Sequence, residues 1–297
     1  MKLLLTGSSG FVGSVLVGCR PCIPFTDDGS DVDLRDIERV NRVVARIKPD
    51  AVIHLAAQSF VPASFANPRE TYEINFLGTL NLLAALKHAG FSGRLLYVGS
   101  GDGYGLVSQA NLPVTEEQPL KPRSPYAVSK IAAEALCYQW SQAEAIDVVM
   151  TRSFNHIGPG QSDRFVVADF ARQVVEIGKG RREPVIRTGD IDVTRDFTDV
   201  RDVVRAYLLL LDQGRRGEVY NVCSESERSV RDVLSRLLAL AGVDARIEQD
   251  AARLRRSEQK RMCGSNRKLH HDTGWSPEVA LDTSLRDILD DWEAKLK

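Results

Sequence analysis

The sequence is poor in the features that mark membrane, metal-binding or nucleic-acid-binding proteins. Its 297 residues carry a formal net charge of −1, which gives no reason to expect a nucleic acid or an anionic membrane as a partner. No stretch approaches the roughly 18 apolar residues of a membrane span. Glycines interrupt the apolar opening "MKLLLTGSSG", so we do not expect a signal peptide.

Cysteine is also scarce, with five scattered residues. Cys19 and Cys22 form a Cys-x-x-Cys pair, but no second pair and no nearby histidine accompany it. We therefore expect no metal site, and we interpret the cysteines as reduced thiols of a cytoplasmic protein.

Short apolar runs alternate with helical patterns through the first half of the chain. The runs lie at 2–7, 51–57, 94–100 and 147–155, and helical patterns cover 34–47 and 70–90. Such alternation predicts an α/β fold with a Rossmann-type, doubly wound parallel sheet. We assign residues 1–155 to this domain and 156–297 mainly to a smaller C-terminal α/β lobe, with 190–222 returning to the first domain.

A glycine-rich turn follows the first predicted strand and opens a helix. Gly7, Gly10 and Gly13 would let the backbone approach a pyrophosphate, and the helix N-terminus would offer free N–H groups. We therefore predict a dinucleotide site here. The acidic residue expected about 20 residues later is not clear among several aspartates, and Arg20 or Arg35 could meet a 2′-phosphate. The choice between NAD and NADP stays open.

"SPYAVSK" places Tyr126 and Lys130 four residues apart, and Pro125 favours a helix start just before them. Both side chains would then share one helical face. A neighbouring ammonium favours the phenolate form, so we expect Lys130 to lower the pKa of Tyr126 toward neutrality. A serine or threonine hydroxyl would complete the set, and "GSGDGYG" (99–105) offers one.

With these motifs in place, the chain resembles the extended short-chain dehydrogenase/reductase superfamily, which acts on nucleotide sugars. The resemblance rests on the glycine turn, "HLAAQ", "NFLGTLNLL", "GSGDGYG", "YAVSK", "RSFNHIGPGQ", "RDFTDVRDV" and "GWSP". It implies Ser100, Tyr126 and Lys130 as the catalytic triad. The chain is most similar to the branch that contains GDP-mannose dehydratase and GDP-4-keto-6-deoxy-mannose reductase.

The resemblance also implies which residues hold the two ligands. Those expected at the cofactor, NADPH or NADH, are Gly7, Gly10, Phe11, Val12, Gly13, Asp33, Leu34, Leu55, Ala56, Ala57, Asn75, Val98, Tyr126, Lys130 and Phe154. Those expected at the GDP-sugar are Gln58, Ser59, Ser64, Asp102, Asn155, Val166, Arg195, Arg255 and Glu258. Arg195 suits a diphosphate because a guanidinium fork matches phosphate oxygens. His156 fits either a ligand site or a satisfied core position.

"GSGDGYG" separates two activities of this branch. Dehydratases need a base for the C5 proton, and by resemblance their loop carries a glutamate where this sequence has Asp102. Aspartate is one methylene shorter, and a misplacement of about 1 Å can cost about a hundredfold in rate. We therefore expect reduction of the C4 keto group of GDP-4-keto-6-deoxy-D-mannose to GDP-D-rhamnose, or to its C4 epimer, GDP-6-deoxy-D-talose.

Three alternatives remain open from the sequence: a nucleotide-sugar 4-epimerase, a GDP-mannose 4,6-dehydratase, and a non-catalytic NADP-binding protein of the same fold. Helices at 70–89 and 125–143 carry apolar faces beyond the needs of one core. By resemblance these helices would pair two copies into a homodimer through a four-helix bundle.

Overall fold

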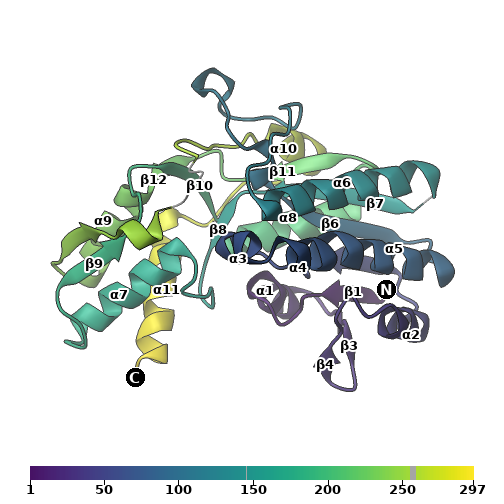
Figure 1. Cartoon of the computed structure of the whole chain (residues 1–297), viewed down its shortest axis with the longest axis horizontal. Helices are drawn as coiled ribbons and strands as arrows, with labels where there is room; N and C mark the ends of the chain where they lie inside the picture. The colour runs from purple at the N-terminus through teal and green to yellow at the C-terminus, as the bar shows by residue number, and fades with distance from the viewer. Residues whose placement is uncertain (145, 255–258) are drawn as a thin grey trace.

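The computed structural model describes residues 1–144, 146–254 and 259–297. Its centre is a sheet of six strands in the order β11-β7-β6-β5-β1-β2 (Figure 1). All neighbouring strands in this sheet are parallel. The strands are β1 (Leu3–Thr6), β2 (Ile23–Pro24), β5 (Ala51–His54), β6 (Arg94–Ser100), β7 (Asp147–Ser153) and β11 (Val219–Val222). The predicted doubly wound parallel sheet is confirmed.

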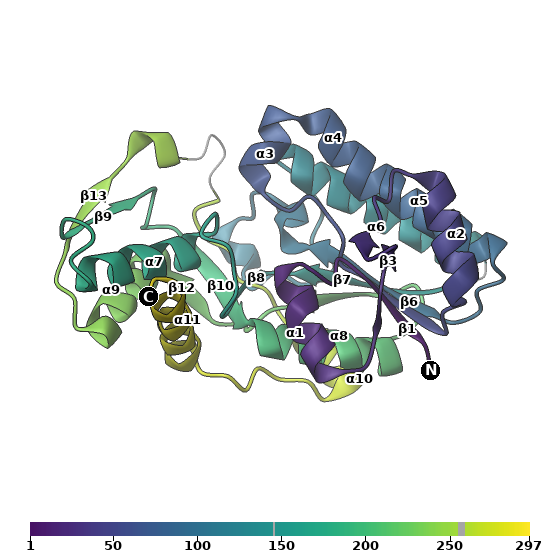
Figure 2. The same cartoon turned by 90° about the horizontal axis from the view of Figure 1, so that it is seen from below.

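Helices cover both faces of this sheet, so most residues of its longer strands are buried between the two layers. Figure 2 shows α2 (Ile37–Ile47), α5 (Gly78–His88) and α6 (Pro125–Ala143) on one face. The other face carries α1 (Phe11–Cys19), α8 (Val200–Gln213) and α10 (Arg267–Thr273). Successive side chains of a strand point to opposite faces. Accordingly, Leu4 packs with the first group of helices, and Leu3 and Leu5 pack with the second.

A second lobe lies beyond the carboxyl ends of these strands, at the left in Figure 1. Its core lies between α7 (Val166–Gly178), α9 (Val230–Ala241) and α11 (Leu281–Lys295), which all pack on one another. A three-stranded sheet joins β12 (Glu227–Ser229), β10 (Thr194–Asp199) and β8 (Asn155–Ile157), and β9 (Val185–Thr188) pairs with β13 (Arg246–Gln249).

The chain crosses between the two parts more than once. After β10, helix α8 and strand β11 lie in the first domain, where β11 pairs with β7. The chain returns there again through α10, which packs on α8 and β11. The smaller elements are the hairpin β3 (Thr26–Asp27) and β4 (Ser30–Asp31), the helices α3 (Val61–Ala66) and α4 (Pro68–Tyr72), and the short turns η1 (Glu73–Leu77), η2 (Gly101–Tyr104), η3 (Gln109–Asn111) and η4 (Ala251–Arg253).

Two predicted elements are each divided in the structure. The helix expected at 70–90 is interrupted by η1, a π-helical turn in which the Gly78 N–H bonds to the Glu73 carbonyl five residues back. The strand expected at 147–155 ends at Ser153, because Phe154 still donates to Val222 whereas Asn155 already pairs with Phe197 of β10. The chain therefore changes sheets at Phe154.

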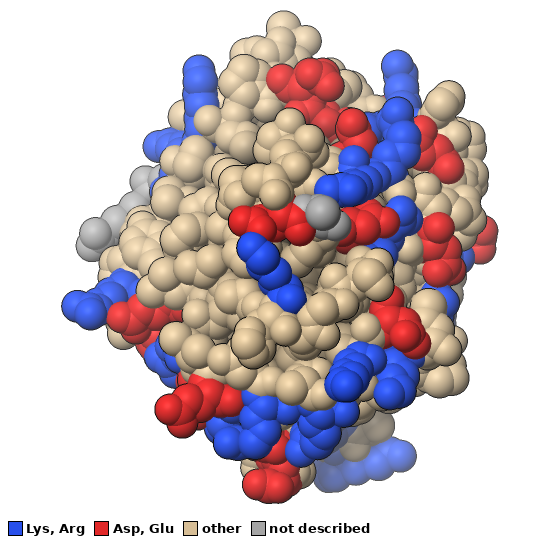
Figure 3. All heavy atoms as spheres, turned by 90° about the vertical axis from the view of Figure 1, so that its right-hand side faces the viewer, with Lys and Arg blue, Asp and Glu red and all other residues tan. Residues whose placement is uncertain are grey.

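Charges of both signs are interspersed on the side of the molecule that lies at the right in Figure 1, as Figure 3 shows. Within the described ranges, the helices do not combine the length and apolarity needed to cross a membrane.

Candidate active site

The predicted catalytic pair lies in the first turns of α6. The Ser124 hydroxyl caps this helix by accepting the Ala127 N–H at 3.0 Å, and Pro125 fills the first position. Tyr126 and Lys130 follow one turn apart on the helix. Tyr126 is partly buried, and Lys130 is only 5% exposed. The local sequence thus fixes where the helix begins and which face carries both groups.

Ser100 reaches the same place from the end of β6. Its hydroxyl caps the short turn η2 by accepting the Asp102 N–H at 3.2 Å, and it also hydrogen-bonds to the Tyr126 phenol. The residue beside it is small, and a Cβ on Gly101 would lie 3.1 Å from the Phe154 ring, so a larger residue would require that ring to shift by a few tenths of an ångström. The structure therefore brings the serine and the tyrosine of the predicted triad together.

The expected lowering of the Tyr126 pKa is wrong for this structure. Burial raises the pKa of Tyr126 above its usual value, the Asp102 charge raises it further, and the hydrogen bond with Ser100 lowers it only in part. The Lys130 ammonium lies over the ring of Tyr97, 4.6 Å from its centroid. The phenol is therefore neutral at physiological pH, and it can donate a proton.

Lys130 is itself perturbed. Burial lowers its pKa to about 8, and Cys137 and Glu134 act in the opposite direction. A low-dielectric site disfavours the charged form of lysine, so a buried ammonium releases its proton more readily than one in water. Lys130 therefore begins to lose its charge just above neutral pH.

Asn75, in the π-helical turn, ties the catalytic helix to the loop after β5. Its side-chain oxygen accepts the Gln58 N–H at 2.8 Å. Its amide donates to the Gln58 carbonyl at 3.0 Å and to Ser129 Oγ at 2.9 Å. Ser129 in turn donates to the Tyr126 carbonyl at 2.7 Å. A π-helical turn often marks a functional site, and Asn75 is the buried residue of this one.

A buried histidine continues this network, and sequence analysis gave it no role. His54 Nε2 lies 3.0 Å from Thr79 Oγ1, which donates to the Asn75 carbonyl at 2.6 Å. The hydroxyl of Thr79 must therefore accept from His54, which places the proton on Nε2. Nδ1 then accepts from Thr6 Oγ1 at 2.7 Å. Burial, together with the Lys130 charge, lowers the pKa of His54 to about 3, so the ring is neutral.

The glycine turn between β1 and α1 has the shape that a pyrophosphate requires. A Cβ on Gly13 would lie 2.2 Å from the Gly7 carbonyl oxygen, and the Gly10 N–H bonds to that same oxygen at 3.1 Å. Gly10 caps α1, and the first turn of the helix carries no acidic residue. The first N–H groups of α1 and its positive dipole end therefore suit a phosphate, and these residues fit a dinucleotide.

The other predicted cofactor residues lie mainly around the carboxyl ends of the parallel strands, where open α/β sheets place ligands. Phe11 and Val12 begin α1, and Phe11 stacks on His156 with centroids 5.9 Å apart. The remaining positions are Leu55, Ala56 and Ala57 directly after β5, Val98 near the end of β6, and Phe154 directly after β7.

The candidates for the adenosine end are already engaged in contacts within the protein. Asp33 forms a bidentate pair with Arg35, whereas Leu34 is buried in the core. Arg20 pairs with Asp212. Both arginines that could meet a 2′-phosphate are therefore paired with a carboxylate in this structure.

The residues predicted at the sugar differ in how accessible they are. Gln58 uses its side chain locally, donating to Thr71 Oγ1 at 3.1 Å and accepting from the Phe60 N–H at 2.6 Å. Ser59 is exposed. Ser64 is fully buried and donates to the Val61 carbonyl at 2.7 Å. Asp102 is exposed on η2, beside Ser100.

The candidates for the nucleotide lie in the second lobe or at its edge. Asn155 is exposed at the start of β8, and Val166 begins α7. Arg195, on β10, donates to the carbonyls of Thr194 and Gln259, both at 2.7 Å. Arg255 and Glu258 lie outside the described residues.

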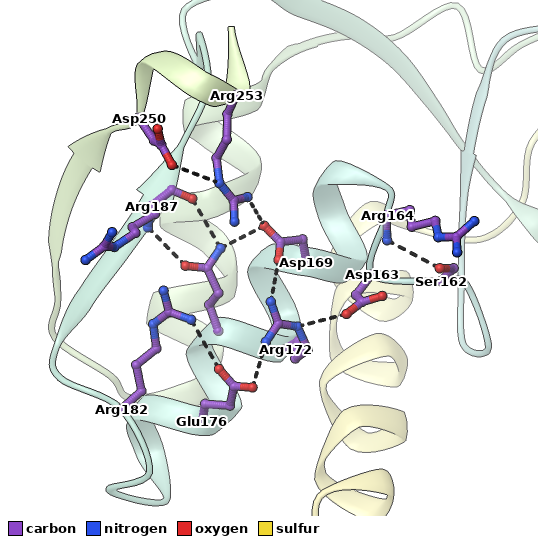
Figure 4. A network of polar contacts seen from close by, with 11 residues as sticks. Ser162, Asp163, Arg164, Asp169, Arg172, Glu176, Arg182, Arg187, Asp250 and Arg253 are labelled. Atoms are coloured by element: carbon purple, nitrogen blue, oxygen red, sulfur yellow. Dashed lines mark hydrogen bonds and ion pairs between the residues drawn. The ribbon is translucent and has the colours of Figure 1, made fainter. Parts of the chain in front are cut away.

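The segment that leads to these last two positions is anchored on α7. Figure 4 shows Asp169 between two arginines. It accepts from Arg253 at 2.6 Å and from Arg172 at 2.8 Å, while Gln173 donates to it at 2.8 Å. Arg253 ends η4. This cluster therefore ties η4 to the helix that begins with Val166.

Comparisons with known proteins agree with this geometry. Residues 29–288 match the family model described as GDP-mannose 4,6 dehydratase. A Pseudomonas aeruginosa protein named GDP-6-deoxy-D-mannose reductase is 48% identical, over 100% of this chain and 98% of its own length. A dTDP-glucose 4,6-dehydratase from Haemophilus influenzae is 27% identical, over 96% of each chain.

Two solved structures are similar to this chain over nearly its whole length. The structure of RMD from Pseudomonas aeruginosa complexed with NADPH superposes with a TM-score of 0.93 and 48% identity, covering 99% of this chain and 100% of that one. A UDP-glucose 4-epimerase with UDP-glucose, from Thermotoga maritima, has a TM-score of 0.90 and 25% identity, with 100% of both chains covered.

Proposed function

Because the chain belongs to the GDP-mannose 4,6-dehydratase family, we propose that it acts as a reductase within that family. The reaction is the NAD(P)H-dependent reduction of the C4 keto group of GDP-4-keto-6-deoxy-D-mannose to GDP-D-rhamnose. The observation that carries this proposal is the loop after β6. It keeps the hydroxyl of Ser100 beside Tyr126 but has Asp102 where a dehydratase base would stand. The full-length relative named as a reductase supports the same choice.

The cofactor would be held by the turn from Gly7 to Gly13 and by the N-terminus of α1. When bound, a reduced nicotinamide supplies a hydride to a sugar carbon. NADPH is supported by the solved relative that contains it, and NADH remains the second candidate. Lys130 would contribute its ammonium to this part of the site while it stays protonated.

Tyr126 acts as the proton donor. Reduction of a ketone leaves charge on the C4 oxygen, and this oxygen must receive a proton from a group in contact with it. The neutral phenol of Tyr126 supplies that proton, and the Ser100 hydroxyl donates a hydrogen bond that orients the same oxygen. The proton leaves the phenol, the O4–H bond forms, and solvent then restores the phenol.

The GDP-sugar would lie between the candidate residues of the first domain and those of the second lobe. Arg195 of β10 suits the diphosphate, and the end of β8 with Asn155 suits a diphosphate oxygen or a sugar hydroxyl. Arg255 and Glu258 are proposed at the nucleotide ribose.

A coupled assay tests the function. GDP-4-keto-6-deoxy-D-mannose is generated in situ by a separate dehydratase, and this protein is added with NADPH or NADH. We expect loss of reduced-nicotinamide absorbance that is absent with GDP-mannose alone. Product NMR then distinguishes GDP-D-rhamnose from GDP-6-deoxy-D-talose. Absence of oxidation with either cofactor would rule out the reductase.

A homodimer is part of the same proposal. Large apolar side chains project from the surface of α3, α4, η1 and α6, where they are 36 to 54% exposed: Phe65, Tyr72, Leu77, Val128 and Tyr138. Pairing these helices with those of a second copy would remove this surface from water. Light scattering should give twice the monomer mass, and Tyr138→Glu should shift it toward the monomer. We also propose that the enzyme is cytoplasmic, which fractionation of the source cells would test.

A further inference from the structure

A buried ion pair lies behind the catalytic helix and has no part in the chemistry described so far. Glu134 stands one turn beyond Lys130 on α6 and pairs with Arg152 of β7. Arg152 Nη2 lies 2.7 Å from Glu134 Oε1, and Nε lies 3.0 Å from Oε2. The two side chains are only 8% and 12% exposed. A bidentate pair of this kind fixes the relative orientation of both partners.

The third nitrogen of the same guanidinium faces the catalytic loop. Arg152 Nη1 donates to the Tyr104 hydroxyl at 3.0 Å and to the Glu116 carbonyl at 2.9 Å. Tyr104 ends η2, the turn that Ser100 caps, and it is fully buried. Its hydroxyl donates to Asn221 Oδ1 of β11 at 2.7 Å. The guanidinium is therefore bonded on one side to the catalytic helix and on the other to the end of the catalytic loop.

The pairing of β6 with β7 fixes the position of the Arg152 backbone. Arg152 pairs with Gly99 across β6 and β7, and the next pair in the register is Ser153 with Ser100. Arg152 is thus only one register position away from the catalytic serine. Because β7 is paired along its length, its backbone is rigid at Arg152, and the side chain extends from a fixed position.

We propose that Glu134, Arg152 and Tyr104, called here the Arg152 unit, position the two halves of the catalytic triad, holding the loop of Ser100 against the helix of Lys130. They are positioning residues, because they act through the triad and not on the substrate. The proposal rests on the proposed reductase function for its kinetic test only.

The charge of Glu134 gives the Arg152 unit a second, measurable consequence. Tyr97 of β6 lies under the Lys130 ammonium, neutral His54 faces it from β5, and Cys137 follows on α6. Burial raises the pKa of Cys137, so the thiol is neutral. Arg152 on β7 brings a positive charge to the same region. Of the two groups that raise the pKa of Lys130 against the effect of burial, Cys137 and Glu134, only Glu134 is a carboxylate, so replacing it with an amide removes its share of that effect.

The first test replaces the carboxylate with an amide of the same size. In Glu134→Gln we expect kcat to fall about tenfold or more, with little change in the KM for NADPH, because the triad loses its geometry and the cofactor turn does not. The alkaline limb of kcat/KM should move to lower pH by about half a unit or more.

Asp147→Asn is the matched control. Asp147 pairs with Arg94 across the same two strands, at their opposite ends, with Arg94 Nη2 and Asp147 Oδ2 2.9 Å apart. The Asp147→Asn variant also loses one carboxylate charge, but at a site that does not contact the triad. Its kcat and the alkaline limb of its kcat/KM profile should therefore equal those of the parent. If Glu134→Gln behaves as this control does, the proposal is wrong.

A second variant tests the contact with the loop, and a second readout tests the charge effect without the reductase assay. Tyr104→Phe removes one hydroxyl and leaves the ion pair, so we expect kcat to fall while the titration of Lys130 stays unchanged; an unaltered kcat would refute the role of the loop contact. The Lys130 titration is followed by NMR of ¹³C-labelled lysine, with the signal assigned from Lys130→Arg. An equal midpoint in Glu134→Gln and the parent would refute the charge effect, even if the enzyme reduced another substrate.

Discussion

Asn75 Nδ2 donates a 2.9 Å hydrogen bond to Ser129 Oγ, and this bond joins the π-helical turn before α5 to the catalytic helix. Ser129 passes the contact to the Tyr126 carbonyl, and Asn75 holds both backbone groups of Gln58. The loop after β5 and the first turn of α6 thus share one polar anchor, so their spacing does not depend on apolar packing alone.

Removal of this anchor should affect both stability and rate. Asn75→Ala removes the side-chain partner of two backbone groups, the N–H and the carbonyl of Gln58, and each buried unsatisfied group costs about 1–3 kcal/mol. We expect a clearly lower Tm and a kcat reduced about tenfold or more, because Tyr126 loses its support. Asn81→Ala is the control, because Asn81 on α5 makes a single bond of 2.8 Å, to the Leu34 carbonyl. Equal losses of kcat in both variants would contradict the special role of Asn75.

Tyr126→Phe should abolish most activity and spare cofactor binding. The variant lacks the proton donor, and general acid catalysis by a positioned side chain contributes about 10²–10⁴-fold. Steady-state kinetics and the fluorescence titration of NADPH measure the two effects separately. Tyr138→Phe, on the exposed part of the same helix, should behave as the parent does. Retention of full activity in Tyr126→Phe would favour a different proton donor.

The alkaline pH dependence should follow Lys130. Its folded-state pKa is lowered to about 8 by burial, so activity that needs the ammonium should decline above about pH 8. The sign for stability is opposite. The unfolded chain binds this proton up to about pH 10.4, so the contribution of Lys130 to folding stability rises between about pH 8 and pH 10.4. Activity should therefore fall in this window without a loss of fold from this group, which circular dichroism at each pH can check.

Gly13→Ala should weaken binding of the dinucleotide strongly. The new Cβ would lie 2.2 Å from the Gly7 carbonyl, so the turn must open. We expect NADPH affinity to fall by about a hundredfold, the scale for a displacement of about 1 Å at a preorganised site. Gly18→Ala, in the same helix, meets no atom within 4 Å, so it should bind NADPH normally. It should also gain up to about 1 kcal/mol of stability.

Local pattern was sufficient for much of the site. The spacing of Tyr126 and Lys130, the proline before them and the glycine turn after β1 each act through neighbouring residues, so the sequence predicts their arrangement. The roles of His54, Thr79 and Ser129 were missed, although "HLAAQ", "NFLGTLNLL" and "YAVSK" contain all three residues. Their partners lie on other elements, and no spacing along the chain indicates such contacts. Glu134 had a weak signal, since it stands at the same four-residue interval after Lys130.

The sequence by itself determined most of the elements, the doubly wound parallel sheet and the helix face that carries the tyrosine and the lysine, because periodicity, capping and glycine sterics are local. Only the tertiary structure decided the protonation of that face. Burial raises the pKa of Tyr126, and burial also lowers the pKa of Lys130 to about 8. It also decided that Arg152 of β7 joins Glu134 to Tyr104. Desolvation and contacts between distant segments exist only when the layers have packed.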